Sequence, residues 1–152
     1  MTHVNAQVRD AVAASLEANT SLEVVFTNRA ADLIDADLPA AVIATATDDV
    51  ARFSKGTSVS GPTELRIIQL AVVVVLYGDS ETVDDDADAL RVEIEPLVGP
   101  ALSSVARVAT HTGSELDIGT DEEGESWYAF LALTWEVEVV TAVGDPENPI
   151  VN

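Results

Sequence analysis

The chain has 152 residues and a formal net charge of −20, from 27 acidic and 7 basic residues. It contains no cysteine, which excludes disulfides, thiolate catalysis and cysteine-based zinc or iron–sulfur sites. The acidic excess argues against nucleic-acid binding through clustered Lys and Arg, and against binding to an anionic membrane surface. Hydrophobic residues make up 47% of the chain. We therefore expect a single globular domain over residues 1–140, followed by a C-terminal tail over residues 141–152.

The composition also indicates an environment. Lys55 is the only lysine, and Asp, Ala, Val and Thr dominate. This is typical of proteins from extremely saline cytoplasm, where salt screens the self-repulsion of an acidic surface; an acidic protein from a mesophile is the alternative. The longest apolar run, Leu70–Tyr77, is too short to span a bilayer, and no basic-then-apolar leader opens the sequence. We expect folding in the cytoplasm without membrane contact.

The N-terminal segment predicts a helix and then a short strand. Apolar side chains recur at helical spacing from His3 to Asn19, and Thr2 is placed to cap that helix. Leu22–Thr27, rich in Val and Phe, predicts a strand. Asn28–Leu38 lacks periodicity, so we expect an exposed connection there, with Arg29 as a candidate contact residue.

A second strand and a long loop are expected next. Ala40–Thr47 is rich in β-branched residues and predicts a strand. Asp48–Pro62 is irregular, and long loops inside a compact domain are often functional. This segment gathers Arg52, Phe53 and Lys55, which are candidate residues for contact with another subunit or partner.

The middle of the chain gives the strongest strand prediction. Glu64–Tyr77 begins with alternation and ends as a continuous apolar run, which is typical of a central strand covered on both faces. Ser80 then predicts a helix N-cap, and the acidic residues after it complement the helix dipole. An apolar helical stripe follows and ends near Gly99 and Pro100.

The last third predicts two strands. Ala101–Ile118 is ambiguous, but its second half can alternate as a strand with a kink at Gly113. An acidic turn over Gly119–Gly124 leads to Trp127–Val139, where a clean period of two predicts a long strand with one buried face.

The predicted fold class is α/β of the α+β type. It has a single mixed, mainly antiparallel sheet with two packed helices, in the order α-β-β-β-α-β-β. The residues after Ala142, which include Pro146 and Pro149, are expected to form a mobile or partner-docked tail. Both prolines are further candidate contact residues.

No residue set in the sequence predicts catalysis, a metal or a cofactor. His111 has no cysteine or second histidine near it that would suggest a metal site. Gly56–Ser60 begins like a nucleophile elbow but ends in serine where glycine is required. The carboxylates of Asp84–Asp86 point about 100° apart on a helix, so they cannot converge on a metal ion. Asp117–Glu125 lacks the ligand spacing of a calcium loop.

Four phrases carry a family resemblance. In chain order they are Asp35-Ala36-Asp37-Leu38-Pro39-Ala40-Ala41-Val42, Glu64-Leu65-Arg66-Ile67, Ile94-Glu95-Pro96-Leu97 near the end of the acidic helix, and Trp127-Tyr128 in the last strand. Together with the order of the segments from Val4 to Val139, they resemble the tail terminator proteins of long-tailed phages, of the kind found in phage lambda. With the acidic composition, the resemblance indicates a tailed virus of a haloarchaeal host.

The resemblance implies a structural virion protein and no catalysis or cofactor. Such proteins form a hexameric ring at the head-proximal end of the tail tube, end tube polymerisation and join the tail to the head. The implied partners are further copies of the chain, the major tail tube protein and a head-completion or connector protein. DNA would pass through the ring without being read, and six copies at −20 each would repel its phosphates.

Three alternatives stay open at the level of sequence. The first is a head-completion adaptor or stopper of the head–tail connector. The second is a small cytoplasmic domain that binds a peptide or protein. The third is an enzyme that uses carboxylates alone, for which Glu64, Glu136 and Glu138 are the candidates.

Overall fold

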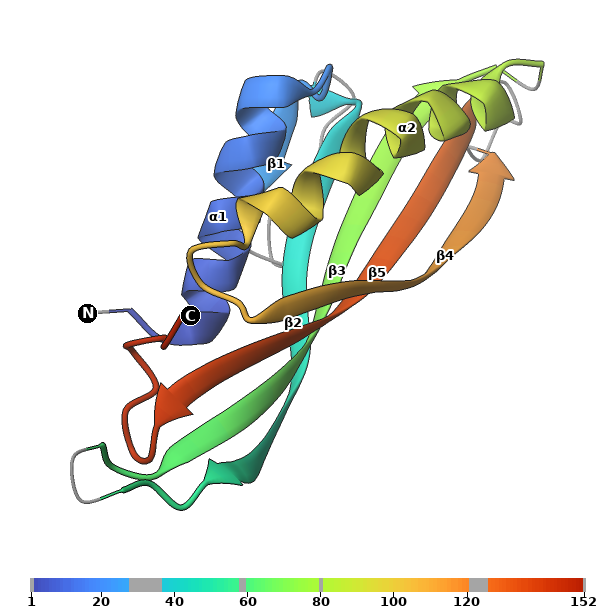
Figure 1. Cartoon of the computed structure of the whole chain (residues 1–152). Coiled ribbons are helices and arrows are strands. Elements are labelled where there is room, and N and C mark those ends of the chain that lie inside the picture. The colour runs from blue at the N-terminus through green and yellow to red at the C-terminus, as the bar shows by residue number, and fades with distance from the viewer. Residues whose placement is uncertain (1, 28–36, 58–59, 80, 121–125, 152) are drawn as a thin grey trace.

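The computed structural model describes residues 2–27, 37–57, 60–79, 81–120 and 126–151. In these residues one five-stranded sheet carries two helices on one of its faces (Figure 1). The elements in chain order are α1 (Val4–Asn19), β1 (Val24–Phe26), β2 (Ala40–Ser54), β3 (Thr63–Gly78), α2 (Val83–Ala101), β4 (Val108–Thr120) and β5 (Trp127–Ala142). The predicted fold class and the order α-β-β-β-α-β-β are confirmed.

The sheet is built around the pairing of β3 with β5. The strand order is β1-β2-β3-β5-β4, with β1 parallel to β2 and all other neighbours antiparallel. The β3–β5 register continues without a shift from Thr63 opposite Ala142 to Gly78 opposite Trp127. Because successive side chains of a strand point to opposite faces, this register fixes the face of every side chain on both strands.

The core lies between the sheet and the two helices. Even-numbered residues of β3 from Ile68 to Leu76 and odd-numbered residues of β5 from Ala129 to Val139 point toward the helices and are buried. Full burial of one Leu, Ile or Val side chain stabilises the fold by about 1.5–3 kcal/mol. The buried side chains on these two strands are Ile68, Leu70, Val72, Val74, Leu76, Ala129, Leu131, Leu133, Trp135, Val137 and Val139.

The first helix meets this face along one apolar stripe. Its buried residues are Val4, Val8, Val12, Ala13 and Leu16. The predicted cap at Thr2 is wrong: His3 is the N-cap residue, and its Nδ1 accepts the backbone N–H of Asn5 at 3.1 Å. Either side chain can supply an acceptor to a free N–H of the first turn, so composition alone does not choose between them.

The second helix has its own stripe of buried residues, Val83, Ala87, Leu90, Ile94 and Val98. The predicted cap, Ser80, lies outside the described residues. Instead, Oδ1 of Asp79 accepts the backbone N–H groups of Glu81 and Thr82 at 2.9 and 3.1 Å. The helix ends at Ala101, close to the predicted end.

The loop predicted over Asp48–Pro62 is wrong for its first half. The second strand continues to Ser54 and pairs with β3 along its whole length, with register shifts after Thr45 and after Arg52. The residues that connect the strands are therefore 55–62. Gly56 has φ +80°, and a Cβ there would lie 2.5 Å from the carbonyl carbon of Gly61, so this turn requires glycine.

The expectation that the central strand is covered on both faces holds at Val75, which is buried on the face away from the helices, but not along the whole strand. In the described part of the chain, both helices lie on one face of the sheet (Figure 1). Tyr77, which points to the other face, is 50% exposed. The kink expected at Gly113 is present as a register shift between His111 and Gly113. Among the described residues, no helix has the length and hydropathy needed to cross a membrane.

The core predicts the effect of a cavity. Ile68 is fully buried at the centre of β3, so Ile68→Ala should lower the free energy of unfolding by about 2–5 kcal/mol. The matched control is Val92→Ala on α2, where the side chain is 75% exposed and the change should stay within about 0.5 kcal/mol. Denaturant unfolding in concentrated KCl measures both. Equal losses for the two variants would contradict the described core.

Candidate interaction surfaces

The face of the sheet that the helices leave uncovered is the first candidate surface. On β2, β3 and β5 its upper half consists of three cross-strand rows that contain no charged residue. We call these nine residues the open-face patch: Ala40, Val75 and Phe130; Val42, Val73 and Ala132; Ala44, Ala71 and Thr134. On β4 the same rows continue with Glu115 beside Ala132 and Asp117 beside Phe130, so carboxylates border the patch along that edge.

The exposure of the patch is uneven. Ala40, Ala44 and Val75 are buried, whereas the other members are half-buried or exposed, and Phe130 is 46% exposed. Beyond it, Tyr77 and Tyr128 stack edge to face with ring centroids 5.4 Å apart. Contiguous apolar surface of this kind is uncommon on a monomer and marks interaction sites.

The hairpin formed by β2 and β3 is the second candidate surface. It extends beyond the helices at the lower end of the sheet (Figure 1). Arg52, Phe53 and Lys55 all lie at its end and are exposed, so the structure brings these three predicted contact residues together. Arg29, the fourth basic or aromatic candidate, lies outside the described residues.

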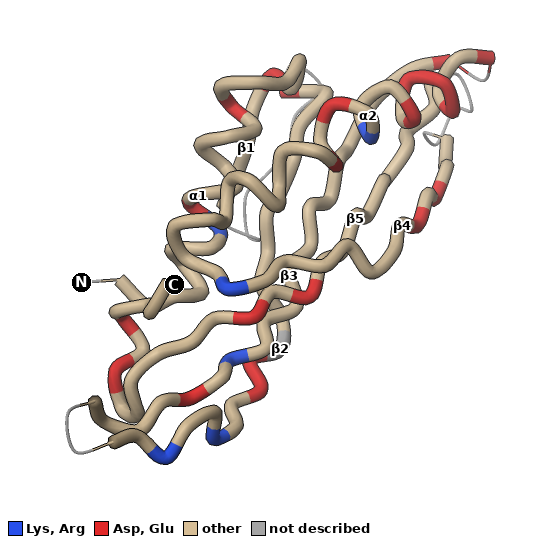
Figure 2. Tube along the Cα trace, in the orientation of Figure 1, with Lys and Arg blue, Asp and Glu red and all other residues tan. Residues whose placement is uncertain are grey.

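Most described cations are already partnered. Arg66 pairs with Asp48 and Glu64 at 3.2 Å each, and Arg91 and Arg107 pair with carboxylates of their neighbours. Arg9 donates to Oγ1 of Thr45 at 2.7 Å. Among the described residues, no hydrogen bond or ion pair is formed by the side chains of Arg52 and Lys55, the two cations of the hairpin end. Figure 2 shows this basic end far from the acidic N-terminal half of α2.

The C-terminal segment is folded against the domain. The carbonyl oxygen of Pro146 accepts the backbone N–H of Val4 at 2.8 Å. Pro149 forms a bridge to Thr141, and the N–H of Ile150 donates to the carbonyl of Val140 at 2.7 Å. The contacts of Pro149 and Ile150 use the edge of β5 beyond Glu138, where the pairing of β5 with β4 ends.

This segment also meets the hairpin. Phe53, Arg107, Val140 and Ile150 line a small cavity of about 90 Å³, and the Arg107 guanidinium lies 5.3 Å from the centre of the Phe53 ring. Pro146 and Pro149 do not line this cavity. Sequence reasoning missed Arg107 and Ile150, because only the long-range strand pairing brings them to Phe53.

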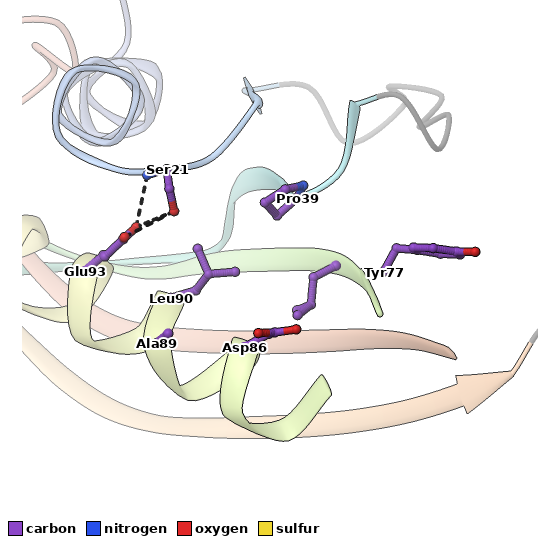
Figure 3. Close-up of a pocket in the computed structure, with 8 residues that line it drawn as sticks. Ser21, Pro39, Tyr77, Asp86, Ala89, Leu90 and Glu93 are labelled. Atoms are coloured by element: carbon purple, nitrogen blue, oxygen red, sulfur yellow. Dashed lines mark hydrogen bonds between the residues drawn. The ribbon is translucent and has the colours of Figure 1, made fainter. Parts of the chain in front are cut away.

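A larger cavity of about 270 Å³ lies at the upper end of the sheet (Figure 3). Leu76 and Leu90 provide apolar wall, and Asp86 and Glu93 project from one side of α2. The remaining lining residues are Ser21, Pro39, Tyr77 and Ala89. We call it the end pocket.

The two carboxylates of the end pocket differ in their partners. Glu93 accepts the backbone N–H and the hydroxyl of Ser21 at 2.9–3.1 Å, which ties α2 to the segment after α1. The Asp86 carboxylate has no hydrogen-bond or ion-pair partner among the described residues. One of its oxygens lies 3.5 Å from where a Cβ of Gly78 would be, so the carboxylate is close to the end of β3.

The other residues considered for chemistry do not converge. Glu64 lies on the helix side of the sheet, whereas Glu136 and Glu138 lie on the open face. His111 is exposed and stacks on Trp135, with ring centroids 4.7 Å apart. Among residues 2–27, 37–57, 60–79, 81–120 and 126–151, no group of three or more His, Asp or Glu could hold a metal ion.

Comparisons with known proteins add little to this description. No protein-family model and no curated protein sequence matches the chain. One solved structure that is similar is described as "Virion of native gene transfer agent (GTA) particle". The match covers 90% of this chain and 99% of that chain, with 17% sequence identity and a TM-score of 0.40. We base no functional argument on a likeness of this size.

The fold and the surfaces together define a two-layer α+β domain. The helices cover one face of its sheet, and the described part of the other face carries an uncharged patch. A hairpin end with two cations that have no partner among the described residues lies at the opposite end of the sheet from an acidic pocket.

The C-terminal turn gives a prediction about pH. The side chain of Asn148 and the backbone N–H of Glu147 donate to the Asp145 carboxylate and hold the pKa of Asp145 below its ordinary value. A lowered folded-state pKa stabilises the fold at pH values above the unfolded pKa, near 4, and this contribution is lost as the pH falls through the folded pKa. Asn148→Ala should move the pKa of Asp145 upward, toward its ordinary value.

An NMR titration of the side-chain carboxyl carbons measures this shift directly. Asn19→Ala removes a different asparagine, which donates to the carbonyl of Ser15, and should leave the Asp145 titration unchanged. An unchanged Asp145 titration in Asn148→Ala would contradict the described turn.

Proposed function

We propose that this chain is a structural virion protein that forms a ring at the head-proximal end of a viral tail tube. In this role it ends tube polymerisation and joins the tail to the head. Its partners are further copies of itself in a hexamer, the major tail tube protein and a head-completion or connector protein. It acts without catalysis, and DNA passes through the ring unread.

The observation that carries the proposal is the open-face patch. An assembly subunit needs a surface that prefers a partner to water, and uncharged exposed apolar area supplies that preference. We assign the patch to contact with a second copy of the chain. We assign the contact to unlike surfaces of neighbouring copies, because a contact of that kind repeats around a ring when the rotation closes, whereas patch-to-patch contact stops at a dimer.

The acidic composition supports the same role. Phosphates passing through a lumen of like charge are repelled, so DNA does not adhere to the wall. The order of segments that led to the resemblance is also the order of elements in the fold. Both observations agree with a ring protein at a DNA-conducting junction.

Molecular mass in concentrated KCl tests the proposal. Light scattering behind a size-exclusion column should give about six times the 16.0 kDa of the chain. Phe130→Asp replaces the most exposed apolar side chain of the patch with a charge beside Asp117 and should weaken assembly at least tenfold in protein concentration. High salt is needed because the acidic chains repel one another in dilute buffer, and this repulsion would oppose association whether or not the patch forms the contact.

The control for this test is Val92→Asp. It adds the same charge at a residue that is 75% exposed on α2, away from the open face, and should leave the mass unchanged. A chain that stays monomeric in concentrated KCl at every concentration tested would contradict the proposed function. So would equal losses of assembly in the two variants.

A further inference from the structure

The geometry points to the partner of the end pocket: it receives the Lys55 side chain of a neighbouring copy, whose ammonium group pairs with the Asp86 carboxylate. This inference rests on the proposed function and specifies the contact between subunits. It makes the hairpin end one surface of the contact and the end pocket the other.

The pocket has the chemistry of a lysine site. The apolar side chains of Pro39, Leu76 and Leu90 match an aliphatic stem, and the Asp86 carboxylate has no other partner in the described residues. Lysine places its four-carbon stem on apolar surface while its ammonium group stays with polar groups at the end.

The hairpin end supplies a cation that has no other partner. Lys55 lies directly after β2 and before the glycine turn, so its ammonium group is carried at the extremity of the molecule. It forms no hydrogen bond or ion pair within the described part of the chain. Arg52, three residues earlier, adds a second exposed cation to the same surface. Positive charge on a strongly acidic protein is attracted to the acidic end of a neighbouring copy.

The contact cannot form within one chain. The third strand extends from Thr63, beside the hairpin end, to Gly78, beside the pocket. At about 3.3 Å per residue its 16 residues span roughly 50 Å. A lysine side chain reaches only a small fraction of that distance, so Lys55 can enter the pocket of another copy only.

The pocket also adjoins the open-face patch. Tyr77 lines the pocket, and Tyr77 stacks on Tyr128, which precedes Phe130 on the same face of β5. A neighbouring copy that covers the patch therefore brings its surface to the rim of the pocket. Covering the rim excludes water, and ion pairs that are partly buried are screened less by salt than exposed ones.

Zero-length carbodiimide coupling tests the inference, since Lys55 is the only lysine. The assembled protein is treated in concentrated KCl, digested and analysed by mass spectrometry. We expect a peptide that joins Lys55 to Asp86 or Glu93. In rings assembled from an equal mixture of ¹⁴N and ¹⁵N chains, a bond between subunits should give some joined peptides with one partner of each label, whereas a bond within one chain gives none.

Three variants separate the contact from folding. Lys55→Arg keeps the charge but removes the coupling amine, so the ring should remain while the cross-link disappears. Lys55→Glu should weaken association about tenfold. Combining it with Asp86→Lys should restore association, because the charges are exchanged. The double variant Lys55→Glu with Asp85→Lys should not restore association. Asp85 is exposed one residue away from Asp86 and does not line the pocket.

The outcomes distinguish this inference from the proposed function. A hexamer whose Lys55 couples elsewhere, or whose association is restored equally by Asp85→Lys and Asp86→Lys, overturns the lysine contact and leaves the ring intact. A chain that stays monomeric overturns both. A cross-link from Lys55 to Asp86 or Glu93 between differently labelled chains, together with rescue by Asp86→Lys alone, supports the inference.

Discussion

The pairing of β3 with β5 is the constraint on which the rest of the structure depends. Its register has no shift, so the alternation of side chains along both strands gives the sheet two faces of fixed composition. One face receives the apolar stripes of α1 and α2 and forms the core. The other carries the uncharged open-face patch and then, further along, Glu136 and Glu138. A slip of one residue would exchange the two faces and place Phe130 and the glutamates against the helices.

This division allows a chain with so much acidic charge to fold, and under the proposed function it also leaves a surface for association. The carboxylates are concentrated on α2, on the outer part of β4 and at the ends of strands, where water and salt surround them (Figure 2). Within the described part of the chain most cations are paired, and the two at the hairpin end are not. The charges therefore favour contact between opposite ends of neighbouring copies, while the open face supplies apolar area.

The sequence was sufficient to predict the helices and strands whose apolar side chains all face the one core. Trp127–Val139 has an unbroken period of two and became a strand, and the stripe from Val83 to Val98 became a helix. Prediction was wrong for β2 because its second half has no buried face; the residues around Asp48 and Arg52 therefore lack the alternation that marks a strand. Arg52, Phe53 and Lys55 could be selected from the composition of their segment. The lack of an ion-pair partner for Arg52 and Lys55 among the described residues could not be predicted from it. The end pocket could not be foreseen, because Ser21, Tyr77 and Glu93 come from three separate segments.

The central claim is that one face of the sheet folds the subunit and the other assembles it. The structure of the assembled ring, determined by electron cryomicroscopy in concentrated KCl, tests this claim most directly. The account predicts that the side chains of Val73, Ala132 and Phe130 are covered by a neighbouring chain in every subunit. A ring in which these three side chains face solvent or the lumen would contradict it.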